Sequence, residues 1–182
     1  MKNRDKPQIL ALETIAQTHF FHVESVKLKY SNGVIVDHER IKSPDTGAVL
    51  IIPMLDNETV LLIREYATGV DRYELALPKG RIERDEEVHY AANRELMEEV
   101  GYGAKRLTTL KTLTSSPSYQ SSQIHVILAQ DLFEQQLEGD EPEPIEVIPY
   151  SLRDLSQLIE RHDVTEARSI AALFMARELL VK

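Results

Sequence analysis

The sequence contains no cysteine, which excludes a disulfide scaffold, a thiolate metal site and thiol catalysis. Basic residues are also in the minority, because 21 Lys and Arg stand against 30 Asp and Glu and give a formal net charge of -9. A surface of that sign repels nucleic acid and anionic membranes, so we expect neither as a partner. The chain shows no apolar run as long as a signal peptide or a membrane span. These absences predict a soluble, cytoplasmic protein that needs cations to bind a polyanionic substrate.

Strand patterns dominate the sequence and predict an α+β fold. Alternating residues flank Asn32-Gly33, a dipeptide typical of tight β-hairpins. Further strands are expected at residues 48–55, 59–66, 73–77, 106–114, 123–130 and 145–150. A central helix is predicted from Asp85 as N-cap to Gly101, and two more helices close the chain. The expected organisation is an N-terminal strand and hairpin extension, residues 1–44, and a main domain, residues 45–182.

The predicted central helix concentrates acid on one side. Glu95, Glu98 and Glu99 stand at i, i+3 and i+4, where like charges repel. Carboxylates that converge are costly unless a positive group lies between them. Mg²⁺ and Mn²⁺ fit that role because hard divalent ions take oxygen ligands. The alternative is a solvated helix face, which is the usual place of acidic pairs.

The residues around this cluster follow a longer pattern. Gly80, five residues, Glu86, seven residues and then residues 94–102 (RELMEEVGY) match GX5EX7REUXEEXGU, where U is a bulky aliphatic residue. Only the last U differs, because Tyr102 is aromatic. The pattern resembles the Nudix box, and the chain is identified as a member of the Nudix superfamily. That resemblance implies a Nudix fold, in which mixed β-sheets are sandwiched by helices.

The resemblance also assigns roles to the acidic residues. It implies that Glu95 and Glu99 are direct metal ligands, and that Glu98 is a ligand, a water-mediated partner or the general base. The backbone carbonyl of Lys79 would complete the coordination of about two or three Mg²⁺ or Mn²⁺ ions. Superfamily members hydrolyse a nucleoside diphosphate linked to another group X, with metals that neutralise the pyrophosphate and activate water.

Two other box positions are expected to shape the site. The resemblance implies that Arg94 serves catalysis by forming an ion pair with Glu86, which joins loop to helix and orients the metal carboxylates. Gly80 would let the loop backbone turn close to the metals.

An acidic loop at residues 137–147 (LEGDEPEPIEV) offers carboxylates from outside the helix. In the ADP-ribose branch of the superfamily, a loop glutamate at this place binds metal or acts as the base. By that resemblance Glu143 aligns with the ligand and Glu141 with the general base. The alternative interpretation is a solvated acidic loop.

Stretches outside the box resemble the ADP compounds hydrolases of this superfamily. The matching segments are residues 23–33 (VESVKLKYSNG), 62–69 (LIREYATG), 73–80 (YELALPKG), 116–119 (SPSY) and 137–144 (LEGDEPEP). The resemblance implies that ADP-ribose, diadenosine triphosphate and NADH are cleaved to AMP and a second phosphate ester, in an order that the sequence does not rank. It also implies a homodimer in which the N-terminal strands reach the neighbouring subunit.

Residues near the box give an ambiguous substrate marker. Pro117 lies where ADP-sugar pyrophosphatases carry a proline, and Tyr119 lies where diadenosine polyphosphate hydrolases carry a tyrosine. Many ADP-ribose hydrolases have an arginine where this chain has Ala67, so Arg64 is the expected phosphate contact.

Further substrate contacts are proposed at scattered positions. Glu74 is a candidate acceptor for the adenine amine or ribose hydroxyls, or simply ends a strand. Arg40 is a candidate phosphate partner, although a lone arginine after a hairpin is usually solvated. Phe21 is a candidate to stack on adenine from the partner subunit, although an aromatic at an alternating position is more often core.

Two competing functions follow from the same superfamily. A non-catalytic nucleotide sensor commonly lacks a box glutamate or has gained a DNA-binding domain, and this sequence shows neither feature. RNA decapping is disfavoured because the chain is acidic and lacks a basic patch interleaved with aromatics.

Overall fold

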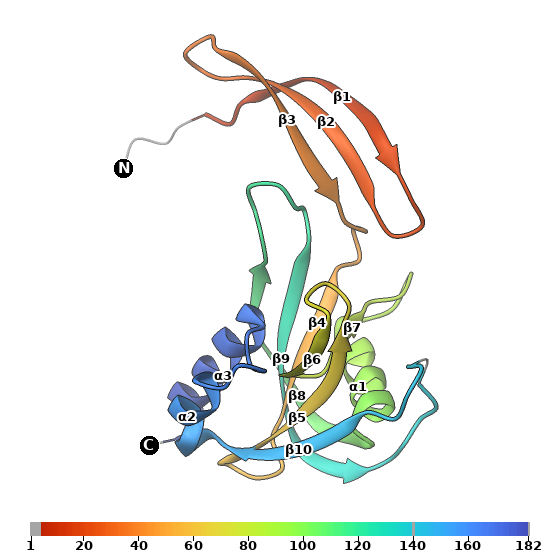
Figure 1. The fold of residues 1–182 in the computed structure, drawn as a ribbon, viewed down its shortest axis with the longest axis vertical. Helices are drawn as coiled ribbons and strands as arrows, with labels where there is room; N and C mark the ends of the chain where they lie inside the picture. The colour runs from red at the N-terminus through yellow and green to blue at the C-terminus, as the bar shows by residue number, and fades with distance from the viewer. Residues whose placement is uncertain (1–4, 140, 182) are drawn as a thin grey trace. The chain divides into compact units, whose positions relative to one another are not determined.

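The structure, a computed structural model, describes residues 5–139 and 141–181, which fall into two compact units (Figure 1). One unit runs to Asp45 and includes Thr114–Gln123. The other comprises Thr46–Leu113 and the chain from Ile124 onward. None of the helices in the described ranges combines the length and apolar character needed to cross a bilayer.

The first unit contains an antiparallel sheet in the order β1-β2-β3. Its strands are β1 (Gln8–Gln17), β2 (His22–Lys29) and β3 (Ile35–Lys42). The predicted hairpin is confirmed, and it turns at Gly33, whose φ of 85° suits glycine. The sequence patterns do not predict β1. All ten of its residues are exposed, so no buried face imposes the alternation by which a strand is recognised.

The second unit contains two further sheets, ordered β7-β4-β9-β8 and β10-β5-β6. Their strands are β4 (Ala48–Pro53), β5 (Thr59–Ala67), β6 (Arg72–Ala76), β7 (Lys79–Arg81), β8 (Tyr102–Thr114), β9 (Gln123–Glu134) and β10 (Glu146–Ser151). Strand β4 runs parallel to β9 and antiparallel to β7, so that sheet is mixed. The helices are α1 (Val88–Glu99), α2 (Leu155–Ile159) and α3 (Ala167–Leu180), with a 3₁₀ turn at Leu152–Asp154. The expected α+β class, with mixed β-sheets and helices, is therefore confirmed.

Strand β4 lies between two apolar clusters. Leu50 and Ile52 belong to the cluster that includes α2 and α3, whereas Val49 and Ile51 belong to the cluster that includes α1. All four side chains have no exposed surface. Because both faces of the strand are buried, its sequence reads as a continuous apolar run and does not alternate. The strand therefore connects the helix that carries the acidic cluster to the opposite layer of the fold.

Helix α1 begins later than the sequence predicts. Glu87 is the N-cap, and its carboxylate accepts hydrogen bonds from the backbone N–H groups of His89 and Tyr90. The expectation that Asp85 caps the helix is wrong. Asp85 has a φ of 63° and belongs to the preceding turn, and the carboxylate of the next residue, Glu86, accepts a hydrogen bond from Arg94.

Candidate metal and substrate site

The last two turns of α1 bring three box carboxylates to the edge of β7. Glu95 and Glu99 are buried, and Glu98 is half-buried. Glu95 lies directly against the backbone of Gly80, where an added Cβ would stand 1.9 Å from the Glu95 Cδ atom. A side chain at position 80 would thus displace the Glu95 carboxyl group from its present place.

Arg94 lies among these carboxylates. Its guanidinium donates to Glu86, Glu95 and Glu98, each at 2.8 Å. The hydrogen bonds with Glu86, which contributes most, and with Glu95 raise the pKa of Arg94 further above its usual range. The sequence predicts the pair with Glu86, and the structure adds the bonds to Glu95 and Glu98. Arg94 is therefore placed to orient carboxylates.

Burial changes the proton affinity of the cluster. It raises the pKa of Glu99 to about 8, and the backbone N–H and positive charge of Lys79 only partly oppose this rise. The N–H of Lys79 donates to the Glu99 Oε2 atom at 3.0 Å. Burial also raises the pKa of Glu95, with Arg94 opposing the rise and the charges of Glu98 and Glu141 adding to it. The site therefore favours an added cation or bound protons.

The donors of the cluster suit a hard divalent ion. They are carboxylate oxygens in a partly buried volume, which is the chemistry that Mg²⁺ and Mn²⁺ prefer. Within residues 5–139 and 141–181, however, no three His, Asp or Glu side chains are already grouped as a metal cage. Arg94 supplies the positive charge instead. A bound ion would therefore share Glu95 and Glu98 with the guanidinium of Arg94.

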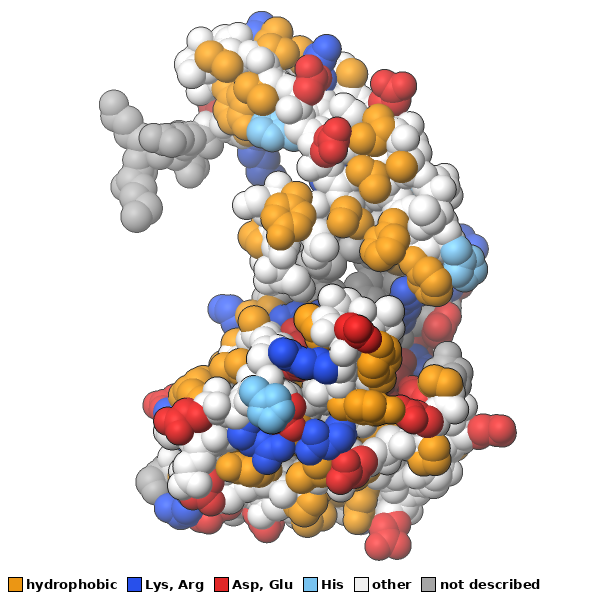
Figure 2. Space-filling model, viewed as in Figure 1, with side chains coloured by type: hydrophobic (Ala, Val, Ile, Leu, Met, Phe, Trp, Pro, Cys, Tyr) orange, Lys and Arg blue, Asp and Glu red, His pale blue; other side chains and the backbone are white. Residues whose placement is uncertain are grey.

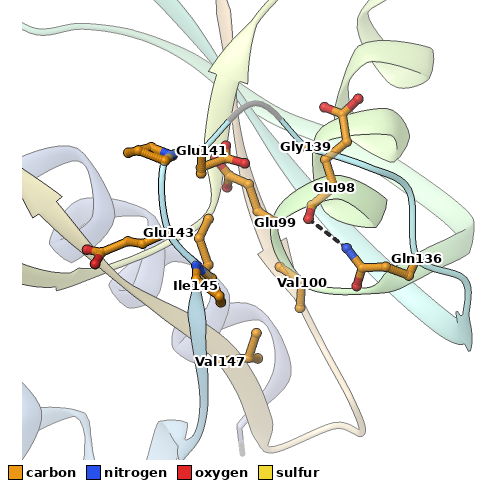
Figure 3. A pocket seen from close by; sticks show the side chains of 11 residues that line it. Glu98, Glu99, Val100, Gln136, Gly139, Glu141, Glu143, Ile145 and Val147 are labelled. Atoms are coloured by element: carbon orange, nitrogen blue, oxygen red, sulfur yellow. Dashed lines mark hydrogen bonds between the residues drawn. The ribbon is translucent and has the colours of Figure 1, made fainter.

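The acidic loop faces the box helix across a cavity of about 470 Å³. The cavity is lined by Glu98, Glu99, Val100, Gln136, Gly139, Glu141, Pro142, Glu143, Pro144, Ile145 and Val147 (Figure 3). Glu141 points toward the α1 carboxylates, and a Cβ added to Gly139 would meet both its Oε2 atom and the Glu98 Cβ atom. Glu143 points away from them, because its Oε1 atom accepts a hydrogen bond from the Tyr73 hydroxyl at 2.6 Å. The structure thus separates the two loop glutamates.

Gln136 supports the C-terminal end of α1, and the sequence patterns do not reveal it. Its Nε2 atom donates to the backbone carbonyls of Glu98 at 2.9 Å and Leu137 at 2.8 Å. The first bond satisfies a carbonyl that the helix leaves without an internal partner. The second lies at the root of the acidic loop, so one amide joins both carboxylate-bearing segments. No local sequence signal marks such a contact.

Arg64 and Glu74 belong to an internal network. Arg64 donates to Asp163 at 2.8 Å and to Glu146 at 2.9 Å. The buried Glu74 accepts from Arg72 at 2.6 Å and from the backbone N–H of Thr165 at 3.0 Å. These bonds attach the segment before α3 to β5 and β6.

To bind substrate as predicted, Arg64 and Glu74 would therefore have to exchange these hydrogen bonds for bonds to the substrate. Asp163 holds a guanidinium on each side, since Arg161 also donates to it, and these contacts keep the pKa of Asp163 below its usual range. The network has a clear structural role, and substrate binding by Arg64 and Glu74 stays a prediction.

The other predicted substrate residues lie in the first unit. Arg40 donates to the buried Glu24 at 2.8 Å. Phe21 is 58% exposed, so it is not a core residue of the described chain. Tyr119 is exposed, and its carbonyl accepts from the Ile41 N–H at 2.8 Å. Pro117 is exposed in the same segment, so the substrate marker stays open between Pro117 and Tyr119.

The raised pKa of Glu99 predicts that metal-free protein loses stability as pH rises. The unfolded carboxyl ionises near 4.5, whereas the native one keeps its proton until about 8. The native state therefore binds more protons across this window, and its advantage is lost as pH increases. Glu99→Gln should remove this dependence. We expect the variant to match wild type near about pH 5 and to exceed it by at least about 1 kcal/mol near about pH 9.

Urea unfolding in excess chelator measures this difference. Glu83→Gln, which changes an exposed acid in the loop before α1, is the matched control and should keep the wild-type pH dependence. Equal pH slopes for Glu99→Gln and wild type would contradict the assignment.

Comparisons with known proteins identify the family of the chain. The chain matches the NUDIX domain over residues 44–173 and the NudE-type Nudix hydrolase N-terminal domain over residues 7–40. It is 49% identical over 179 residues to ADP compounds hydrolase NudE of Escherichia coli (strain K12), covering 98% of this chain and 96% of that protein. It is 34% identical over 170 residues to ADP-ribose pyrophosphatase of Bacillus subtilis (strain 168), covering 88% of this chain and 90% of that one.

A solved structure confirms the predicted Nudix fold. The crystal structure of an ADP compounds hydrolase matches with a TM-score of 0.92 and 48% identity, over 99% of this chain and 97% of the other. The box, the fold that presents it and these matches together show that the chain belongs to the NUDIX family and carries a NudE-type N-terminal domain.

Proposed function

We propose that the protein hydrolyses the pyrophosphate bond of ADP-linked compounds to AMP and a second phosphate ester. The observation that carries this proposal is the convergence of Glu95, Glu98 and Glu99 opposite a second acidic segment. The similarity to an ADP compounds hydrolase and an ADP-ribose pyrophosphatase supports the substrate class. ADP-ribose, NADH and diadenosine triphosphate are the expected substrates.

The residues of the box would hold Mg²⁺ or Mn²⁺, about two or three ions per site. Glu95 and Glu99 are the direct ligands, Glu98 binds directly or through water, and the Lys79 carbonyl completes the set. When bound, the ions neutralise the pyrophosphate oxygens and lower the pKa of water. Arg94 holds the carboxylates in place through its bonds to Glu95 and Glu98.

The acidic loop would complete the chemistry with two distinct glutamates. Glu141 is half-buried beside Glu98, and this position supports its role as the base that takes a proton from the attacking water. Glu143 is the proposed additional ligand, and it reaches the box side only after it leaves Tyr73. Glu98 is the alternative base because it faces the same cavity.

The competing functions have weaker support. A non-catalytic sensor would not need the complete set of box glutamates that this chain retains. Decapping of RNA is disfavoured by the net charge of -9. The cytoplasmic location and the absence of nucleic-acid and membrane partners stay predictions.

Turnover should depend on a divalent ion. With Mg²⁺ present, we expect AMP release from ADP-ribose, NADH and diadenosine triphosphate, and none in excess chelator. Glu95→Gln should lower kcat by at least about a hundredfold because it removes a ligand charge. Glu83→Gln, the control, should retain full kcat. Full activity in excess chelator, or unimpaired Glu95→Gln, would contradict the mechanism.

The base assignment predicts a separate outcome for Glu141→Gln. We expect kcat to fall more than about tenfold while the Mn²⁺ dissociation constant changes little, because a base acts on water and not on the ion. Glu138→Gln, an exposed acid of the same loop, is the control. Near wild-type kcat in Glu141→Gln would move the base role to Glu98.

We also propose a homodimer formed through the first unit. Hydrophobic side chains are spread over the visible face of this unit (Figure 2). The exposed large hydrophobic residues of the unit include Ile9, Leu10, Leu12, Ile15, Phe20, Phe21, Val34, Ile35 and Val36. A small sheet that leaves this much apolar surface exposed is typical of an interaction surface, and a second copy would cover it.

The dimer is tested by light scattering coupled to size-exclusion chromatography. Wild type should show twice the chain mass, and Leu12→Glu should shift toward the monomer because it introduces a charge into the apolar surface. Glu13→Lys, on the same exposed strand, should stay dimeric. A monomeric wild type at every concentration would refute the proposal.

A further inference from the structure

A tyrosine on β6 is hydrogen-bonded to a glutamate of the acidic loop. Tyr73 donates its hydroxyl hydrogen to the Glu143 Oε1 atom at 2.6 Å, across 70 positions of sequence. Its ring packs edge-on against Tyr66 of β5 with centroids 5.6 Å apart, and the two residues are register partners. The ring of Tyr73 is thus held by the β5-β6 hairpin, and its hydroxyl is presented to the loop.

The loop geometry allows Glu143 either this hydrogen bond or a position near the box carboxylates, but not both. The chain bends at Pro142 and Glu143, so Glu141 and Glu143 point in different directions (Figure 3). Glu141 is half-buried beside the box carboxylates, whereas Glu143 is exposed and bound to Tyr73. A bond between a hydroxyl and a carboxylate is among the stronger hydrogen bonds of proteins. Glu143 cannot swing toward α1 while this bond is intact.

We propose that Tyr73 is a positioning residue that holds Glu143 away from the box carboxylates, so that metal binding competes with the Tyr73–Glu143 hydrogen bond. The inference rests on the proposed role of Glu143 as a metal ligand. Tyr73 itself touches neither metal nor substrate in this scheme. Its effect is to weaken metal binding by the free energy needed to release Glu143.

Tyr66 provides a matched control on the same hairpin. Its hydroxyl also donates to a carboxylate, that of Asp71, at 2.5 Å, and its exposed fraction of 44% is close to the 47% of Tyr73. Asp71 belongs to the hairpin turn and not to the acidic loop. Tyr66→Phe and Tyr73→Phe therefore remove equivalent hydroxyls, and only the second one frees Glu143.

The experiment measures Mn²⁺ binding to the full chain without substrate, by calorimetry or by the magnetic resonance signal of free Mn²⁺. Tyr73→Phe should bind Mn²⁺ about three- to tenfold more tightly, since one net hydrogen bond no longer competes. Tyr66→Phe should match wild type. Glu143→Gln should bind more weakly, and Tyr73→Phe combined with Glu143→Gln should match Glu143→Gln alone.

The role of Tyr73 and the proposed ligand role of Glu143 give different outcomes in this experiment. Wild-type affinity in Tyr73→Phe, together with weakened binding in Glu143→Gln, would overturn the role of Tyr73 and leave the ligand role intact. Unchanged affinity in Glu143→Gln would overturn both the ligand role and the competition. Equal tightening by Tyr73→Phe in the Glu143→Gln background would also overturn the inference, because the effect would not pass through Glu143. Thermal unfolding of each variant verifies that the fold is retained.

Discussion

The charge of Arg94 is the constraint on which the rest of the candidate site depends. Glu95 and Glu98 lie one turn apart on α1, and Glu86 approaches from the preceding loop. Without a positive group, three carboxylates in one partly buried volume would repel each other. Arg94 bonds all three and also donates to the backbone carbonyl of Arg81. One guanidinium therefore ties the helix, its leading loop and β7 into a single unit that can present carboxylates to an ion.

Local spacing predicts this part of the molecule well. The box positions identify the helix and its acidic face because they all lie within one contiguous segment, residues 80–102. The same spacing does not predict which residue caps the N-terminus of the helix. Asp85 is of a residue type preferred at N-caps, whereas the structure uses Glu87 and places Asp85 in the turn before the helix. The sequence patterns also do not predict β1, since recognition of a strand relies on a buried face that β1 lacks.

The partners of the proposed substrate-binding residues could not be predicted, because their contacts join segments that lie far apart in the sequence. Arg64 finds Asp163 across 99 positions, and Glu74 finds Thr165 across 91. A charged residue in a strand can contact substrate or another element, and its local sequence is the same in both cases. Tyr73 likewise gives no local sign that it meets Glu143. The acidic loop could be predicted as a source of carboxylates, but not the bend that sends them in different directions.

The double burial of β4 has a consequence for local unfolding. Its alternate side chains belong to the apolar clusters of α1 and of α3, so neither helix can separate from the sheet without exposing one face of the same strand. The opening of either layer should therefore approach global unfolding in free energy. The amide protons of β4 should then be among the slowest in the chain to exchange with solvent. The carboxylate-bearing helix should thus rest on the part of the fold that opens last.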